Sequence, residues 1–272
     1  MWNQLFDGPV FVLTSDQDWA PSWAADRFLK LIGEYSLPVH FFRTNPCPSI
    51  DAAARNLATC TQGWHPNFLP GSSHGTNAEE VIQYMQSHFP SCRTVRSHTF
   101  VEGTSYWTAL ARSGIVADSQ VPTVYQAHLQ PLLHWTGILR FPLYFEDDVF
   151  FEWEADGLSL ETVKKALFTP GLKILNFHAT FVACNISSGP HYRRIRGEIF
   201  GKPEPPALAG PERGTRTVFE ELVTSILKAG CRFESFESVV DRVVAVIASE
   251  PERFPRPFSS RFGAGEWSGS HA

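Results

Sequence analysis

The stretch Val10-Phe-Val-Leu-Thr-Ser-Asp-Gln-Asp-Trp19 places two aspartates directly after a run of hydrophobic and β-branched residues. The run 10–14 predicts a short buried strand, so Asp16 and Asp18 come just beyond its carboxyl end. Carboxylates so close in sequence repel each other, and they are tolerated if one binds a cation while the other acts as a base. This arrangement indicates metal-assisted hydrolysis. The alternative is that both aspartates only cap the following helix, since Asp is favoured near a first helical turn.

Outward from this stretch, the chain alternates between helix-like and strand-like segments. Hydrophobic spacing predicts helices over residues 21–33, 49–57 (opened by a cap at Ser49), 77–88, 104–113, 158–168, 215–229 and 236–249. Runs of β-branched and aromatic residues predict strands over residues 37–42, 94–100 and 172–178. Repeated βα units predict an α/β fold with a largely parallel sheet, whose functional residues gather at the carboxyl ends of the strands.

The composition predicts one main globular unit. A hydrophobic content of 43% over 272 residues is enough for a sizeable core. We therefore expect a single catalytic domain over residues 1–250, with a proline-rich surface excursion at residues 203–211. The tail over residues 251–272 is rich in Pro, Gly and Ser, so we expect it to lie on the surface or to be disordered.

Charge and cysteine content exclude several classes of protein. The net charge of -5 comes without long runs of one sign, so we expect no basic face and no nucleic-acid partner. The five cysteines are scattered and lack CxxC spacing, which indicates neither a disulfide framework nor a cysteine-rich zinc site. Residues 1–8 do not resemble a leader, and no apolar stretch approaches the length of a membrane span. We therefore expect a soluble cytoplasmic protein.

Several polar residues fall at the predicted strand ends and form the candidate site. They are Asp16, Asp18, His65, Arg96, His98, Arg140, Asp147, Asp148 and His178. Three histidines and two aspartates at one rim predict a divalent metal site of the mixed His/Asp type. A single histidine is more often structural, because any polar side chain at a strand end can hydrogen-bond locally. The placement of all these residues at one rim favours the metal site over separate structural roles.

Motifs in the same segments resemble those of a known family. Five segments carry the resemblance: Thr14-Ser-Asp-Gln-Asp-Trp, Gly63-Trp-His-Pro-Asn-Phe, Arg96-Ser-His-Thr-Phe, Gly114-Ile-Val-Ala-Asp-Ser and Leu175-Asn-Phe-His. Their order resembles that of the motifs in the polysaccharide deacetylases with a NodB-homology domain, which are similar to carbohydrate esterase family 4. The stretches 64–75 and 140–148 look most like the WbmS-like branch, found with genes of surface-polysaccharide synthesis. The resemblance runs from about Val10 to about Val239. It implies a distorted (β/α)7 barrel, a divalent metal held by one Asp and two His, an Asp base and a His acid.

The resemblance also implies roles for single residues. Asp16 matches the base, and Asp18 and His65 match the metal ligands. The family's second histidine lies four residues after the first, but Leu69 stands there, so the third ligand is either His98 or His74. We favour His98, because a strand end holds a ligand more rigidly than a Gly/Ser loop.

Two further catalytic residues follow from the motifs. Arg96 matches the arginine that orients the base, although the proline usual two residues later is replaced by His98. His178 in Leu-Asn-Phe-His matches the general acid.

Such a site suits removal of an N-acetyl group from a sugar or surface-polysaccharide precursor, with Zn²⁺ as the expected metal. We expect Trp19, Trp64, Arg140 and Asp148 to contact the substrate, and Trp107, Trp135 and Tyr144 also lie near the motifs. The alternative for any one of these aromatic residues is an ordinary place in the core. Two rival functions stay open: an amidohydrolase that acts on a small non-sugar amide, and a non-catalytic binding subunit with the same fold. The joint retention of the four motif residues that carry the proposed chemistry argues against the second rival.

Overall fold

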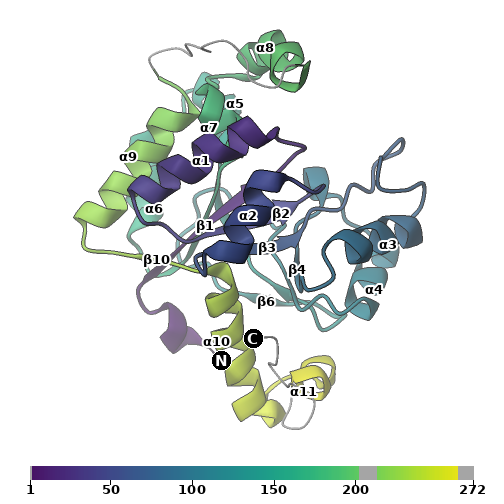
Figure 1. Ribbon diagram of the computed structural model, residues 1–272. Coiled ribbons are helices and arrows are strands. Elements are labelled where there is room, and N and C mark those ends of the chain that lie inside the picture. Colours follow the sequence, from purple (N-terminus) through teal and green to yellow (C-terminus); the bar gives the residue numbers. More distant parts are fainter. Residues whose placement is uncertain (1, 202–212, 263–272) are drawn as a thin grey trace.

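The computed structural model describes residues 2–201 and 213–262, and a single curled sheet forms its centre (Figure 1). Ten strands make up this sheet within the described ranges: β1 (Pro9–Asp16), β2 (Val39–Arg43), β3 (Cys60–Trp64), β4 (Thr94–Val95), β5 (Ala117–Asp118), β6 (Leu132–Leu133), β7 (Leu139–Arg140), β8 (Leu143–Glu146), β9 (Gly171–Asn176) and β10 (Phe233–Glu234). Their order is β6-β7-β5-β4-β3-β2-β1-β9-β8, with β10 also on β1. All pairings are parallel except that of β6 with β7.

Helices surround the sheet. They are α1 (Ser22–Glu34), α2 (Pro48–Asn56), α3 (Ala78–His88), α4 (Thr104–Arg112), α5 (Asp147–Ala155), α6 (Leu160–Leu167), α7 (Ala179–Cys184), α8 (Gly189–Gly201), α9 (Thr215–Lys228), α10 (Phe236–Ser249) and α11 (Arg256–Phe262), with short 3-10 turns η1 (Asn3–Phe6), η2 (His98–Phe100) and η3 (Pro251–Arg253). Figure 1 shows α8 and α10 at opposite ends of the molecule. No helix among the described residues is both long and apolar enough to cross a membrane.

Strand β1 is the central element, because it pairs along its length with β9 and at its carboxyl half with β2. Its hydrophobic residues Phe11, Val12 and Leu13 are almost fully buried, as expected for a strand covered on both faces. The sheet curls because the segment after β5 hydrogen-bonds to β8: the Leu143 amide donates to the Val121 carbonyl (2.8 Å). The parallel direction brings the carboxyl ends of β1, β3, β4, β8 and β9 to one rim.

The fold class is therefore a distorted β/α barrel, as the sequence predicts. The sheet has ten strands rather than seven, since the two-residue strands β6, β7 and β10 join it. Two local predictions are wrong. The residue before α2 is Cys47, with no side-chain cap from Ser49, and Pro48 opens the helix instead. The strand predicted over residues 94–100 is only Thr94–Val95, and His98 begins a 3-10 turn in which Thr99 has a positive φ.

Residues 251–262 of the predicted tail are ordered in the structure, and one side of this segment is buried. This stretch forms η3 and α11, and the side chains of Phe254, Phe258 and Phe262 are buried at 7%, 2% and 0% exposure. Phe254 stacks on Trp2 with ring centroids 5.6 Å apart. Aromatic side chains spaced by four residues gain enough from burial to order a short helix that is rich in Pro and Ser. Residues 263–272 and the excursion at 203–211 lie outside the described residues.

Candidate metal and catalytic site

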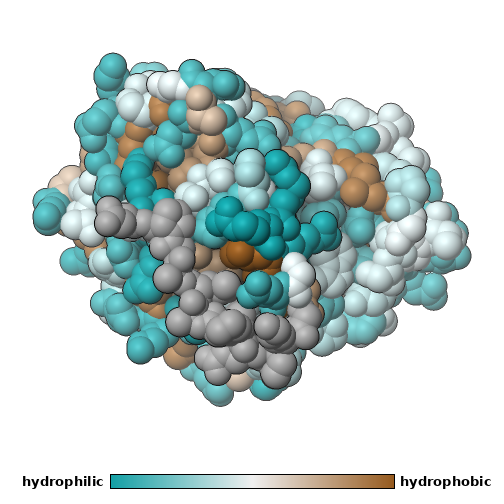
Figure 2. All heavy atoms as spheres, turned by 90° about the horizontal axis from the view of Figure 1, so that it is seen from above, coloured by the Kyte–Doolittle hydropathy of each residue, from teal (hydrophilic) through white to brown (hydrophobic). Residues whose placement is uncertain are grey.

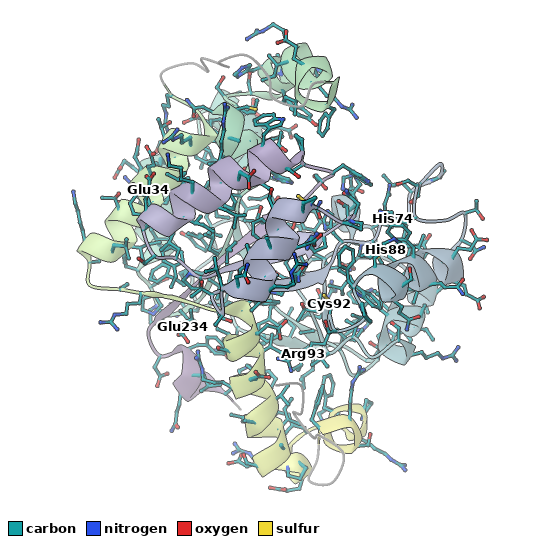
Figure 3. All side chains as sticks on the ribbon, in the orientation of Figure 1. Glu34, His74, His88, Cys92, Arg93 and Glu234 are labelled. Carbon is teal, nitrogen blue, oxygen red and sulfur yellow. The ribbon has the colours of Figure 1, made fainter. Side chains whose placement is uncertain are left out.

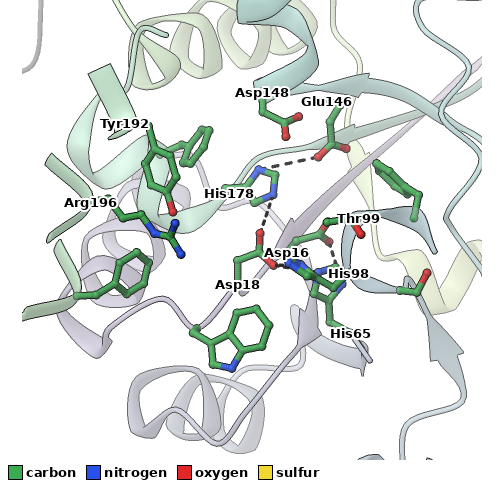
Figure 4. Close-up of a pocket in the computed structure, with 15 residues that line it drawn as sticks. Asp16, Asp18, His65, His98, Thr99, Glu146, Asp148, His178, Tyr192 and Arg196 are labelled. Carbon is green, nitrogen blue, oxygen red and sulfur yellow. Dashed lines mark hydrogen bonds and ion pairs between the residues drawn. The ribbon is translucent and has the colours of Figure 1, made fainter. Parts of the chain in front are cut away.

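A cavity of about 440 Å³ opens at the carboxyl rim of the sheet (Figure 4). Its walls consist of Asp16, Asp18, Trp19, His65, Ser97, His98, Thr99, Phe100, Glu146, Asp148, His178, Phe181, Tyr192, Arg196 and Phe200. Most of them come directly after β1, β3, β4, β8 and β9, and the last three come from α8. Seen from the side of α8, the surface is mostly hydrophilic, with hydrophobic residues in small separate patches (Figure 2).

Three potential metal ligands converge inside this cavity. Asp18 Oδ1 lies 3.0 Å from His65 Nε2 and 2.8 Å from His98 Nδ1, and one ligand atom from each residue lies within 4.8 Å of the others. Burial alone would raise the pKa of Asp18, but hydrogen bonds with His178, His65 and His98 hold it well below its ordinary value. An ionised carboxylate with two imidazoles is a donor set that suits zinc, with room left for water or substrate.

The backbone that carries these ligands adopts an unusual conformation. Asp18 and Trp19 have φ values of 46° and 55°, and Thr99 and Phe100 each have 55°. These four are half of the positive-φ residues other than glycine among the described residues, and all four line the cavity. The turn is held from β2, since the Gln17 amide donates to the Phe42 carbonyl (2.9 Å) and the Trp19 amide to Thr44 Oγ1 (3.0 Å). Such backbone costs on the order of 1 kcal/mol per residue and is concentrated at functional sites.

Asp16 lies beside the potential metal ligands and is held by an arginine. Arg96 is fully buried, and its Nη1 donates to Asp16 Oδ1 (2.7 Å), Asn176 Oδ1 (2.6 Å) and Thr14 Oγ1 (3.1 Å). Asp16 Oδ1 is also 4.0 Å from His65 Nδ1. The guanidinium therefore fixes the orientation of the Asp16 carboxylate at the cavity wall.

His178 forms the opposite wall and is oriented by a second carboxylate. Its Nδ1 lies 2.6 Å from Asp147 Oδ1, its backbone amide donates to Asp147 Oδ2 (2.9 Å), and its Nε2 lies 3.3 Å from Asp18 Oδ2. Burial alone would lower the pKa of His178, but Asp147 and Asp18 raise it well above its ordinary value. The sequence placed Asp147 at a strand end without assigning it a role. In the structure it orients the histidine so that Nε2 faces Asp18.

His74 does not join the potential metal ligands. Its Nδ1 accepts from the Asn67 amide (3.0 Å). Its ring stacks on that of Tyr84, with centroids 4.4 Å apart, and the Tyr84 ring packs on that of His88 at 4.2 Å. Figure 3 shows His74 next to His88. Burial lowers the pKa of His74 to about 4, so the ring is neutral and accepts this hydrogen bond. Its ring also lies 5.7 Å from that of Trp19. His74 thus orders the loop between β3 and α3 rather than facing Asp18.

The expected substrate contacts divide into two groups. Trp19 and Asp148 line the cavity. Trp64 does not: it is 1% exposed in a second core with Met85 and Trp107, and its Nε1 donates to the Phe89 carbonyl (2.9 Å). Trp64 is the last residue of a covered strand, so its side chain points into the packing layer.

Arg140 also lies outside the cavity wall. It hydrogen-bonds to Asp118 (3.1 Å), pairs with Glu102 and stacks over the Trp107 ring at 4.5 Å. Burial raises the pKa of Asp118 to about 7 although Arg140 opposes it. Trp135 and Tyr144 do not line the cavity either: Trp135 is 61% exposed and Tyr144 is buried.

Sequence reasoning missed the wall formed by α8. Tyr192, Arg196 and Phe200 lie on this helix, and Phe181 on α7 lies between His178 and Tyr192, with ring centroids 5.1 Å and 4.9 Å away. All four lie within helices and not at the end of a strand, so the rule that selected the other candidates did not apply. The only available signal was the four-residue spacing of Tyr192, Arg196 and Phe200.

Comparisons with known proteins identify the family of the chain. The family model described as WbmS-like polysaccharide deacetylase matches residues 13–196. No curated protein matches the chain. A solved structure from Bordetella bronchiseptica, described as a candidate polysaccharide deacetylase involved in O-antigen biosynthesis, is 26% identical over 82% of this chain and 92% of its own, with a TM-score of 0.72.

More distant structures are also similar. A family 4 acetyl xylan esterase from Clostridium thermocellum, in complex with a cobalt ion, is 11% identical over 87% of this chain and 92% of its own (TM-score 0.45). A family 4 pseudoenzyme from Bacillus anthracis is 9% identical over 85% of this chain and 65% of its own (TM-score 0.42). At these scores neither decides whether this chain is catalytic. The match of the family model over most of the chain does decide its membership: the protein belongs to the WbmS-like polysaccharide deacetylases.

Proposed function

We propose that the protein is a metal-dependent hydrolase that removes an N-acetyl group from a sugar or a surface-polysaccharide precursor. One observation carries the proposal: Asp18, His65 and His98 line one cavity together with Asp16 and His178, and buried Arg96 and Asp147 hold these last two from behind the cavity wall. Family membership supports a deacetylase, and the described O-antigen role of the Bordetella protein supports a surface-polysaccharide substrate. Action in the cytoplasm stays a prediction from the sequence.

The protein side chains divide the chemistry between the two pairs. Bound by Asp18, His65 and His98, a zinc ion would supply Lewis acidity for the substrate carbonyl and lower the pKa of water. Asp16, oriented by Arg96, removes the proton of the attacking water. His178 then donates the proton on Nε2 to the leaving amine, because Asp147 occupies its Nδ1. Trp19, at the cavity wall, offers an apolar face to the sugar ring.

The experiment loads the purified protein with zinc and measures acetate release from a panel of N-acetylated sugars, and ring opening of small cyclic amides. We expect acetate release that is lost on chelation and restored by adding zinc back. Turnover of the cyclic amides alone would favour the amidohydrolase. Stoichiometric zinc without turnover of any compound would favour the binding subunit.

A further inference from the structure

Helix α8 forms a wall of the cavity that the deacetylation chemistry does not use. Ile195 and Ile199 anchor this helix in a small core with Trp23, Cys184 and Ile186. Tyr192, Arg196 and Phe200 follow at four-residue spacing and line the cavity. The helix therefore has one buried stripe that fixes it and a neighbouring stripe that faces the space in front of His178.

Arg196 is the only arginine or lysine among the residues that line the cavity. Within residues 2–201 and 213–262, no hydrogen bond or ion pair engages its guanidinium. Other arginines of the rim are paired: Arg96 with Asp16, and Arg140 with Asp118 and Glu102. Figure 4 shows the Arg196 and Tyr192 side chains pointing into the same space beside His178.

The other charges of the cavity lie elsewhere. Its carboxylates Asp16, Asp18, Glu146 and Asp148 belong to β1, β8 and the segments that follow them. Asp148 forms no ion pair with Arg196, and Asp16 is already paired with Arg96. The cavity thus has an acidic wall that holds the reacting groups and a separate wall with a phenol hydroxyl and a cation that no described residue pairs with. A guanidinium with five donors beside a hydroxyl is a typical binding site for a carboxylate or a phosphate.

We propose that Arg196 and Tyr192 bind an anionic group of the substrate, so that the preferred substrate is an acidic N-acetylated sugar rather than a neutral one. This inference rests on the proposed deacetylase function and names its substrate class. The ring contacts from His178 through Phe181 to Tyr192 connect the reacting end of the cavity with the anion end. A substrate that spans both would place its acetamido group at His178 and its carboxylate or phosphate at α8. A cavity of this size falls in the usual range for small-molecule sites.

The test compares probes that share one sugar and differ in charge. The neutral probe is the methyl glycoside of N-acetylglucosamine. The anionic probes are the matching N-acetylglucosaminuronic acid glycoside, N-acetylglucosamine 1-phosphate and uridine diphosphate N-acetylglucosamine. Calorimetric titration of the zinc-loaded protein gives each Kd, and a chelated sample shows whether the anion binds to the metal instead. The uronic acid and phosphate probes separate the two sources of negative charge.

We expect at least one anionic probe to bind about tenfold or more tightly than the neutral probe, as charge-assisted hydrogen bonds predict. R196Q should bring the ratio of the Kd for the neutral probe to the Kd for the anionic probe to about two or less. R196K should keep part of this ratio, and Y192F should lower it by a smaller factor than R196Q. R194Q is the matched control, since Arg194 is exposed on the same helix but does not line the cavity. Its ratio should equal that of the parent protein.

The proposal is overturned if no anionic probe binds more tightly than the neutral one, or if R196Q keeps the preference. It is also overturned if R194Q loses the preference to the same extent, because then only net charge matters. Acetate release from the same probes keeps the two proposals apart. Arg196-dependent binding without any release counts against the deacetylase alone, whereas equal binding and release for neutral and acidic probes counts against this inference alone.

Discussion

Buried histidines occur in two regions of the sheet, the interior and the carboxyl rim, and they differ in their partners. His40 on β2 has both ring nitrogens beside hydroxyls, Thr61 Oγ1 at 2.8 Å and Thr94 Oγ1 at 2.9 Å. Burial and the nearby arginines lower its pKa well below the ordinary value. At the rim, His178 is also buried, at 8% exposure against 0% for His40, but its partners are the carboxylates of Asp147 and Asp18, and its pKa is raised.

The comparison shows that the partner, and not burial, decides what a buried titratable group does. Neutral partners leave His40 uncharged and structural, whereas carboxylates hold a proton on His178 where it faces a cavity. Lys173, in the interior strand β9, is a further case: burial lowers its pKa to about 8, and it has a carbonyl, Pro170 O (3.2 Å), rather than a carboxylate as its partner. We therefore expect rim variants to change activity and interior variants to change stability.

The largest expected effect is the loss of metal from the rim. D18A, H65A and H98A should each lose bound zinc and about a thousandfold or more in kcat/KM, because Lewis-acid stabilisation is worth several kcal/mol. H74A is the matched control and should keep its zinc, since His74 stacks on Tyr84 away from Asp18. Elemental analysis of the four purified variants measures this. Full zinc in H98A together with its loss from H74A would reverse the assignment of the third ligand.

A smaller loss should follow when the proposed base is made neutral. D16N keeps a nearly isosteric side chain, so we expect it to bind zinc normally and to lose about a hundredfold to ten-thousandfold in kcat, the usual contribution of a positioned base. Single-turnover rates and zinc content are the measurements. If D16N releases acetate at a rate close to that of the parent protein, another group takes the water proton.

The orienting carboxylate of His178 should matter less than the base. D147N removes the charge beside Nδ1 but can still accept a hydrogen bond there, so we expect kcat to fall by about ten- to a hundredfold with little change in KM or zinc content. E152Q is the control, because Glu152 is exposed on the same helix α5 and does not line the cavity. A raised KM in D147N with unchanged kcat would assign Asp147 to substrate binding instead.

The smallest effect belongs to the interior, and it concerns stability alone. K173M should raise the free energy of unfolding by about 1 kcal/mol at pH 7, because a buried ammonium with a lowered pKa is less favourable than in the unfolded chain. The lysine loses its proton in the folded protein near pH 8 and in the unfolded chain near 10.5, so the parent gains stability as pH rises through this window. The advantage of K173M should therefore shrink between pH 8 and 10.5. Urea unfolding at several pH values tests this, and an advantage that does not change with pH would assign the effect to packing.

Strand-end reasoning predicted most of the rim. Asp16, Asp18, His65, Arg96 and His178 all come at or directly after the carboxyl end of a strand, and parallel strands bring those ends together whatever the loops do. The same reasoning misplaced Trp64 and Arg140, because alternation along a strand decides whether a side chain faces the cavity or the helices.

Other parts of the site depend on contacts between segments far apart in sequence. His98 reaches Asp18 from a 3-10 turn with a positive φ, and a strand-like sequence gives no sign of that turn. Phe258 and Phe262 of α11, together with Phe254 before it, bury one side of a segment rich in Pro and Ser, since hydrophobic burial outweighs weak local propensity.

By itself, the sequence determined the βα alternation, the central strand and the chemical identity of the residues at its carboxyl end. Hydrophobic periodicity and residue type are local properties, and they suffice for these features. Only the tertiary structure decided that His98 rather than His74 meets Asp18, that Asp147 orients His178, and that α8 brings Arg196 to the cavity. These features depend on distances between segments far apart in the sequence, such as Asp18 and Arg196, and such distances are set by how the helices pack on the curled sheet.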